Sequence, residues 1–168
     1  IKLMMRQTMT DLQTIKALAD RYNLTPSKSK GQNFLFSAEH LARIVEVSGV
    51  QAGDQVLEIG PGLGTLTDEL LKVGVQLHVV ELDRAAIAFL RDTYGDRIDI
   101  IEGDVLRVRL DELHKQWGAY HVVANIPYNI TSKIIRLLAE SPHGPQTFTL
   151  MIQKEVAERV TAQAGDMS

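Results

Sequence analysis

The run from Asn125 to Tyr128 groups side chains that could bind a planar base carrying an amine. The Asn125 side-chain oxygen and the carbonyl groups of Ile126 and Pro127 can accept hydrogen bonds from such an amine. The Tyr128 ring can stack on the base, and the fixed φ of Pro127 limits how these groups are aimed. We interpret the run as a base-binding site; the alternative is an ordinary Asn-Pro loop.

Glycines alternate with other residues after the apolar run Val56–Ile59, giving Gly60, Gly62 and Gly64. Glycine permits a tight turn and lets a ligand approach the main chain closely. The helix expected to follow would direct its first amides at the same place. The spacing is G-x-G-x-G, not the G-x-G-x-x-G of dinucleotide-binding proteins. A turn without any ligand is the alternative that these glycines alone leave open.

Acidic residues follow two further apolar runs. Glu81 comes 21 positions after Gly60, where an acid can bind the hydroxyls of a ribose. Asp104 could accept a hydrogen bond from the exocyclic amine of a base, although a simple turn residue is the better reading of it alone. Glu81 or Asp83 could instead cap the following helix, and Asp83 is well placed to do so.

Short runs rich in Val and Ile alternate with segments of helical spacing from Gln55 onward. This alternation predicts a doubly wound α/β fold, with a parallel sheet covered by helices on both faces. The candidate residues then follow the carboxyl ends of strands, where such sheets bind ligands. The expected strands are residues 56–59, 77–80, 98–101, 120–124 and 148–152, and the expected helices are residues 8–22, 38–47 (capped by Ser37), 65–73, 84–94, 131–140 and 154–164.

The composition excludes several classes of protein. The 168 residues suit one domain, and the absence of cysteine rules out disulfides, zinc ribbons and thiol catalysis. No apolar run approaches the ~18 residues of a membrane span, and no secretory signal is recognisable, so a soluble, cytoplasmic protein is expected. The five histidines show no metal-ligand spacing, and we expect no metal site.

Three motifs together resemble the ribosomal RNA adenine dimethyltransferases, which are S-adenosylmethionine-dependent enzymes of the class I methyltransferase fold. They are E-I-G-P-G-L-G-T-L-T (Glu58–Thr67), N-I-P-Y (Asn125–Tyr128) and G-Q-N-F-L (Gly31–Leu35). Pro61–Gly64 and Ile152–Val160 look like the KsgA-type branch, which modifies small-subunit rRNA. The resemblance implies that two methyl groups are placed on N6 of each of two adjacent adenines, in a hairpin near the 3′ end of that RNA.

The resemblance also implies a role for individual residues. It implies that Asn125, Pro127 and Tyr128 are the catalytic residues and hold the target adenine. It assigns the cofactor to a larger set, in which Asn125 also takes part. That set comprises Gln32, Asn33 and Leu35 at the methionine end, Gly60 and Gly62 at the main-chain approach, Glu81 at the ribose, and Leu82, Asp104 and Val105 at the cofactor adenine.

The charge distribution and the family pattern suggest how the chain is organised. The net charge is −3, yet residues 1–30 hold six basic and two acidic residues. We expect a basic helical extension over residues 1–29, with Lys28 and Lys30 contacting RNA phosphates, and a methyltransferase domain over residues 30–168. The resemblance implies two further strands and a helical domain that the chain lacks. We expect a monomer that acts on the immature small ribosomal subunit, with no membrane partner.

Three alternatives stay open. A dehydrogenase would also carry glycines and an acid, although the glycine spacing and the N-I-P-Y run argue against it. A large-subunit rRNA methyltransferase of the macrolide-resistance type would share most of the motifs. A ribosome-assembly or transcription-factor-like relative without catalysis would keep the fold alone.

Overall fold

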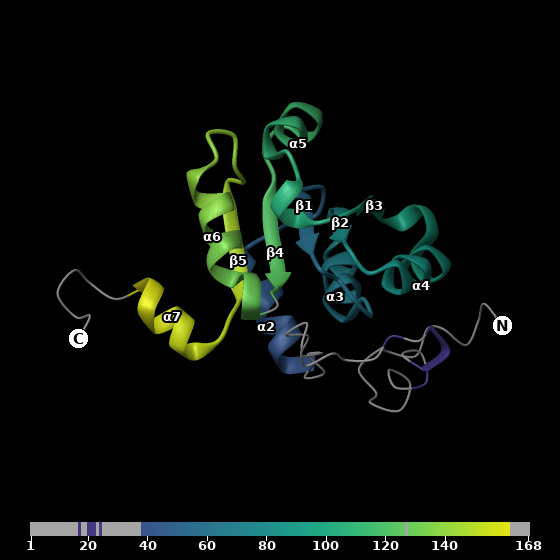
Figure 1. Ribbon diagram of the computed structural model, residues 1–168. Coiled ribbons are helices and arrows are strands. Elements are labelled where there is room, and N and C mark those ends of the chain that lie inside the picture. Colours follow the sequence, from purple (N-terminus) through teal and green to yellow (C-terminus); the bar gives the residue numbers. More distant parts are fainter. Residues whose placement is uncertain (1–16, 18–19, 23, 25–37, 127, 162–168) are drawn as a thin grey trace.

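The computed structural model describes residues 17, 20–22, 24, 38–126 and 128–161 (Figure 1). The strands of this part of the chain form one parallel sheet in the order β3-β2-β1-β4-β5. This arrangement confirms the doubly wound α/β fold. The strands are β1 (Gln55–Ile59), β2 (Gln76–Glu81), β3 (Asp99–Glu102), β4 (His121–Asn125) and β5 (Thr147–Met151).

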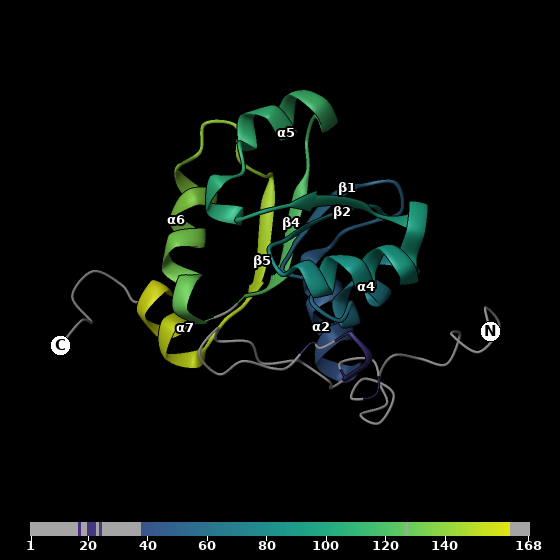
Figure 2. The same ribbon diagram turned by 45° about the vertical axis from the view of Figure 1, so that its right-hand side comes forward.

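Helices cover both faces of the sheet, as the continuous apolar strands require. Figure 2 shows α4 and α6 on opposite sides of it. The described α-helices are α2 (Ala38–Ser48), α3 (Thr65–Val73), α4 (Arg84–Tyr94), α5 (Leu110–Trp117), α6 (Thr131–Glu140) and α7 (Lys154–Thr161), with short 3-10 turns η3 (Gly95–Arg97), η4 (Val105–Arg107) and η5 (Tyr128–Ile130).

Successive residues of each central strand pack into different layers, because side chains alternate across a sheet. Val56 belongs to the core formed with α2, α3 and α4. Its neighbour Leu57 belongs to the core formed with α5 and α6. Both side chains have no exposed surface. The central strand β1 is therefore packed on both faces, which fixes the position of its carboxyl end.

Helix α5 was not among the elements expected from the sequence. This helix has a buried face built from Leu110 and Leu113, with Trp117 partly buried against the same core. That spacing of three and four is helical, but the segment is only eight residues long and its N-cap residue, Arg109, makes no side-chain capping bond. The expected helix over residues 8–22 falls mostly outside the described residues, and so does Ser37.

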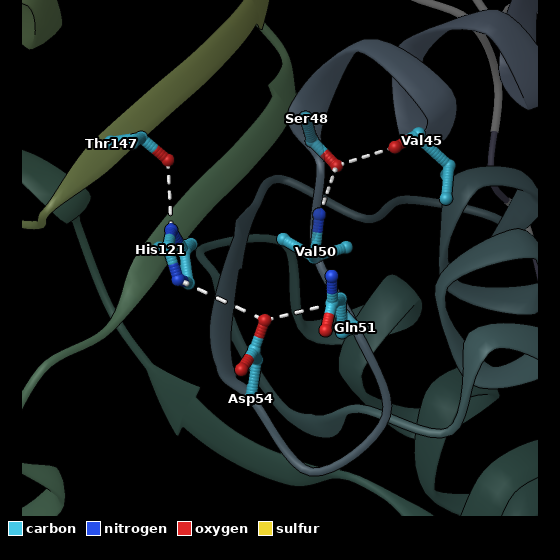
Figure 3. A network of polar contacts seen from close by, with 7 residues as sticks. All are labelled: Val45, Ser48, Val50, Gln51, Asp54, His121 and Thr147. Carbon is cyan, nitrogen blue, oxygen red and sulfur yellow. Dashed lines mark hydrogen bonds and ion pairs between the residues drawn. The ribbon is translucent and has the colours of Figure 1, made fainter.

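A polar network joins the amino ends of three strands, opposite the edge where the candidate site residues lie (Figure 3). His121, at the start of β4, lies 2.8 Å through Nδ1 from Thr147 Oγ1 and 3.9 Å through Nε2 from Asp54 Oδ2. Asp54 also accepts a hydrogen bond from the Gln51 amide at 2.8 Å. The network ties the loop before β1 to β4 and β5.

Within the part of the chain that the structure describes, no helix combines the length and apolar character needed to span a membrane.

Candidate active site

The order of the strands reverses between β1 and β4. The chain leaves β1 toward β2 and β3 on one side, and then returns to place β4 on the other side of β1. Doubly wound sheets bind ligands at the carboxyl ends of the strands beside such a reversal. The glycine-rich turn follows β1, Glu81 ends β2, Asp104 follows β3 and Asn125 ends β4. The topology thus brings these predicted residues to one edge.

The glycine-rich turn needs glycine for its backbone conformation. Gly60, Gly62 and Gly64 have φ values of 65°, 55° and 71°, a region that other residues seldom adopt. The Gly60 amide donates to the carbonyl of Val80 at 2.9 Å, which attaches the turn to β2. The turn leads directly into α3, so the first amides of that helix face the same edge.

Glu81 holds this edge together through main-chain amides. Its Oε2 accepts from the Gly62 amide at 3.1 Å, and its Oε1 accepts from the amides of Leu82 and Asp83, each at 2.8 Å. The side chain is buried. The carboxylate is therefore fixed between the glycine-rich turn and the end of β2, an arrangement that the sequence analysis did not foresee.

The residues beside Glu81 divide between exposed and capping positions. Leu82 leaves 68% of its surface exposed, although it is a large apolar residue. Asp83 accepts from the Ala85 amide at 2.9 Å and caps α4, as the sequence suggested. Asp104 accepts from the Leu106 amide at 3.0 Å, so it caps η4, and the following Val105 is buried.

Asn125 is half-buried, and its backbone position is held by pairing with β5. It is the last residue of β4, in register with Met151 of β5. The next amide, that of Ile126, donates to the Met151 carbonyl at 3.3 Å. Tyr128 opens η5. Of the other predicted residues, Gln32, Asn33, Leu35, Lys28, Lys30 and Pro127 lie outside the described residues, and so does the side chain of Tyr128.

Glu58 is a buried acid at this edge to which the sequence analysis gave no role. It is 1% exposed, and its Oε2 accepts a 2.6 Å hydrogen bond from the Thr67 hydroxyl. The pKa of Glu58 is raised to about 8, chiefly by burial; the charges of Glu81 and Asp68 add to the rise, and the hydrogen bonds from Thr67 oppose it. An acid inside the otherwise apolar run V-L-E-I is the signal that could have found it.

Tyr94 secures the last glycine of the turn from α4. Its hydroxyl donates to the Gly64 carbonyl at 2.9 Å and lies 3.0 Å from Asp68 Oδ1. Burial raises the pKa of the Tyr94 hydroxyl well above its usual value, with Asp68 adding to the shift. Burial likewise raises the pKa of the Asp68 carboxyl. The phenol therefore stays protonated and able to donate over the whole physiological range.

We expect Gly64→Ala to destabilise the fold by about 2–4 kcal/mol, because overpacking adds to backbone strain. A Cβ atom at Gly64 would lie 2.2 Å from the Tyr94 hydroxyl, and φ is +71° there. The measurement is urea unfolding at neutral pH. The matched control is Gly60→Ala, where φ is +65° but, chain neighbours apart, no atom of the described residues lies within 4 Å of the added Cβ. Equal losses in the two variants would contradict the role given to the Tyr94 contact.

The comparisons with known proteins identify the family. The model of the family described as "Ribosomal RNA adenine dimethylase" matches residues 23–168. The chain belongs to this family. Among curated members, it is 40% identical over 163 residues to ribosomal RNA small subunit methyltransferase A of Novosphingobium aromaticivorans, covering 94% of this chain and 59% of that protein. It is 42% identical over 159 residues to the protein of the same name from Mycobacterium avium, covering 90% and 49%.

Solved structures of dimethylase relatives share the fold. A dimethyladenosine transferase from Plasmodium falciparum matches with a TM-score of 0.67 and 29% identity, over 80% of this chain and 48% of that one. The 23S rRNA methyltransferase ErmE matches with a TM-score of 0.64 and 30% identity, over 75% and 50%. The chain thus spans about half the length of the dimethylases it matches.

Proposed function

We propose that this dimethylase chain transfers methyl groups from S-adenosylmethionine to N6 of two adjacent adenines near the 3′ end of small-subunit rRNA. One observation carries the proposal. The glycine-rich turn is tied to Glu81 at the strand reversal, and Asn125 ends the strand on the other side of β1. Family membership supports the reaction class, and the names of the curated relatives support the small subunit as substrate.

The residues at the edge fit the chemical groups of S-adenosylmethionine, which supplies a methyl group activated by a positive sulfur. Glu81 would bind the ribose: a carboxylate has about four acceptor positions, and three of them receive amides. One hydroxyl can take the remaining position, and a second would displace the Gly62 amide. The exposed Leu82 offers an apolar side chain on which the adenine could pack, and Asp104, after the neighbouring strand, could accept a hydrogen bond from its amine.

Gln32, Asn33 and Leu35 are assigned to the methionine end of the cofactor by the family resemblance, as part of the same proposal.

The target adenine would be held by the residues that follow β4. Asn125 accepts from N6–H, which favours a more tetrahedral nitrogen with an available lone pair. Tyr128 stacks on the ring, worth ~1–3 kcal/mol, which offsets part of the few kcal/mol needed to unstack the base. Alignment of the amine with the methyl group would lower the reaction barrier by up to ~7–11 kcal/mol. The N6 lone pair would form the new N–C bond as the bond from sulfur to the methyl group breaks; the neutral thioether S-adenosylhomocysteine would leave, and the cationic amine would lose its proton to water. The reaction therefore requires orientation more than a strong base.

Titration of the chain with S-adenosylmethionine by calorimetry tests the cofactor assignment, with NADH as the control. We expect saturable binding of S-adenosylmethionine and none of NADH, because the glycine spacing does not suit a dinucleotide. Binding of NADH alone would restore the dehydrogenase alternative. Binding of neither would contradict the proposed site.

The large-subunit alternative has one observation in its favour, the likeness to ErmE in fold. The names of the curated relatives favour the small subunit instead. The identity of the methylated rRNA separates the two functions directly.

The remaining expectations from the sequence belong to the same proposal. The chain would act as a monomer in the cytoplasm, on small subunits that are still being assembled. Residues 1–29 would form a basic extension whose Lys28 and Lys30 contact RNA, and residues 30–168 would form the methyltransferase domain.

A further inference from the structure

Basic side chains in the described part of the chain differ in whether an acid partners them. Arg109 pairs with Asp111 at 3.2 Å and with Glu112 at 2.8 Å. Arg136 pairs with Glu140 at 2.9 Å across one turn of α6. Such pairs satisfy the charge locally and suit a solvated surface.

Arg107 lies two residues before Arg109, and Lys133 lies on α6 as Arg136 does, but neither has an ion-pair partner among the described residues. Both side chains are exposed. Lys133 also stands in the first turn of α6, which contains no acidic residue. A cation there is repelled by the positive end of the helix dipole. The helix dipole therefore does not stabilise the Lys133 charge, and no described acid pairs with it, so the charge can serve a ligand.

The two cations come from elements that pack together at the edge carrying the site. Arg107 ends η4, three residues after Asp104, and Lys133 follows the Asn125–Tyr128 run by five residues. Val105 of η4 and Ile134 of α6 share one core. In Figure 2 the turn that follows β3 lies next to α6. Two acids lie close in sequence to these positions: Asp104 precedes the turn, and Asp83 follows Leu82. Each accepts a hydrogen bond from a main-chain amide.

We propose that Arg107 and Lys133 bind phosphates of the RNA backbone next to the adenine that Asn125 holds. The inference rests on the proposed function, because it takes RNA as the substrate. Phosphates suit exposed cations that make no internal pair, since binding then requires no existing ion pair to break. Two such contacts would also help a chain of net charge −3 to hold a polyanion.

The test measures binding of the chain to a synthetic RNA hairpin with two adjacent adenines in its loop, over a series of KCl concentrations. Arg107→Ala and Lys133→Ala should each weaken binding several-fold at low salt. Each should also reduce the slope of log affinity against log salt by about 0.7–0.9, the value for one lost phosphate contact. Arg107→Lys should restore the slope, because it keeps the charge.

Arg109→Ala and Arg136→Ala are the matched controls, since they remove the same charge from the same segments. We expect both to keep the wild-type slope. Unchanged slopes in the Arg107 and Lys133 variants, or equal reductions in the controls, would overturn the proposal that these two residues bind phosphates. A wild-type chain that does not bind the hairpin would overturn it as well. Binding of S-adenosylmethionine, measured on every variant, separates the two claims: failure of wild type to bind it contradicts the proposed function, whereas failure in the salt series alone contradicts only this pair.

Discussion

Asn125→Ala is expected to lower methyl transfer at least a hundredfold, equivalent to about 2.7 kcal/mol of barrier. The side chain stands on a strand end fixed by its register with β5 and by the Ile126 amide. Alanine keeps that backbone but removes the acceptor that orients the amine. Transfer of labelled methyl groups to rRNA measures the loss. Affinity for S-adenosylmethionine should change by no more than about twofold, because in the proposed site most of the cofactor contacts come from the glycine-rich turn and Glu81.

Asn129→Ala provides the matched control for this prediction. Asn129 is exposed in η5, four residues further along the same loop. Its replacement should leave methyl transfer near the wild-type rate. Retained turnover in Asn125→Ala, or equal losses in both variants, would remove Asn125 from the catalytic role.

Glu58 is expected to make the stability of the chain fall as the pH rises. Its pKa is about 8 in the fold and near 4.5 when exposed. Between these values the folded state retains a proton that the unfolded state has lost, so alkali favours unfolding. Glu58→Gln replaces the acid with a neutral side chain of similar shape. We compare the free energy of unfolding of the variant with that of wild type. The difference, variant minus wild type, should be larger at pH 8 than at pH 5 by on the order of 3–4 kcal/mol.

Urea unfolding of both proteins at the two pH values measures this difference, and other titrating groups largely cancel in the comparison. Glu140→Gln is the control, since Glu140 is exposed on α6 and pairs with Arg136. A difference between wild type and Glu58→Gln that does not change with pH would show that Glu58 is ionised in the fold.

The local chemistry of the sequence predicted much of the fold and of the site. Short Val- and Ile-rich runs identified β1 to β5 to within one residue at each end. Asp83 was a plausible helix cap, and it caps α4. The strand ends were identifiable, so the topological rule for doubly wound sheets placed Glu81, Asp104 and Asn125 at one edge. These features depend on neighbouring residues or on a general rule of architecture.

The features that were missed depend on contacts between distant residues. Tyr94 reaches Gly64 across thirty positions, and nothing in either local sequence indicates that contact. The three amides that hold Glu81 depend on how the turn after β1 meets the end of β2. The buried state of Glu58 follows from the packing of α3 over β1, and the contrast between Arg107 and Arg109 appears only when ion pairs are known.

Identifying the methylated nucleotides tests the central claim most directly. The chain is incubated with labelled S-adenosylmethionine and with ribosomal subunits that lack the modification, and the label is then located in the RNA. We predict N6,N6-dimethyladenosine at two adjacent adenines near the 3′ end of small-subunit rRNA, with transfer at least a hundredfold lower in Asn125→Ala. Label in large-subunit rRNA, or no transfer by a chain that binds S-adenosylmethionine, would contradict the account.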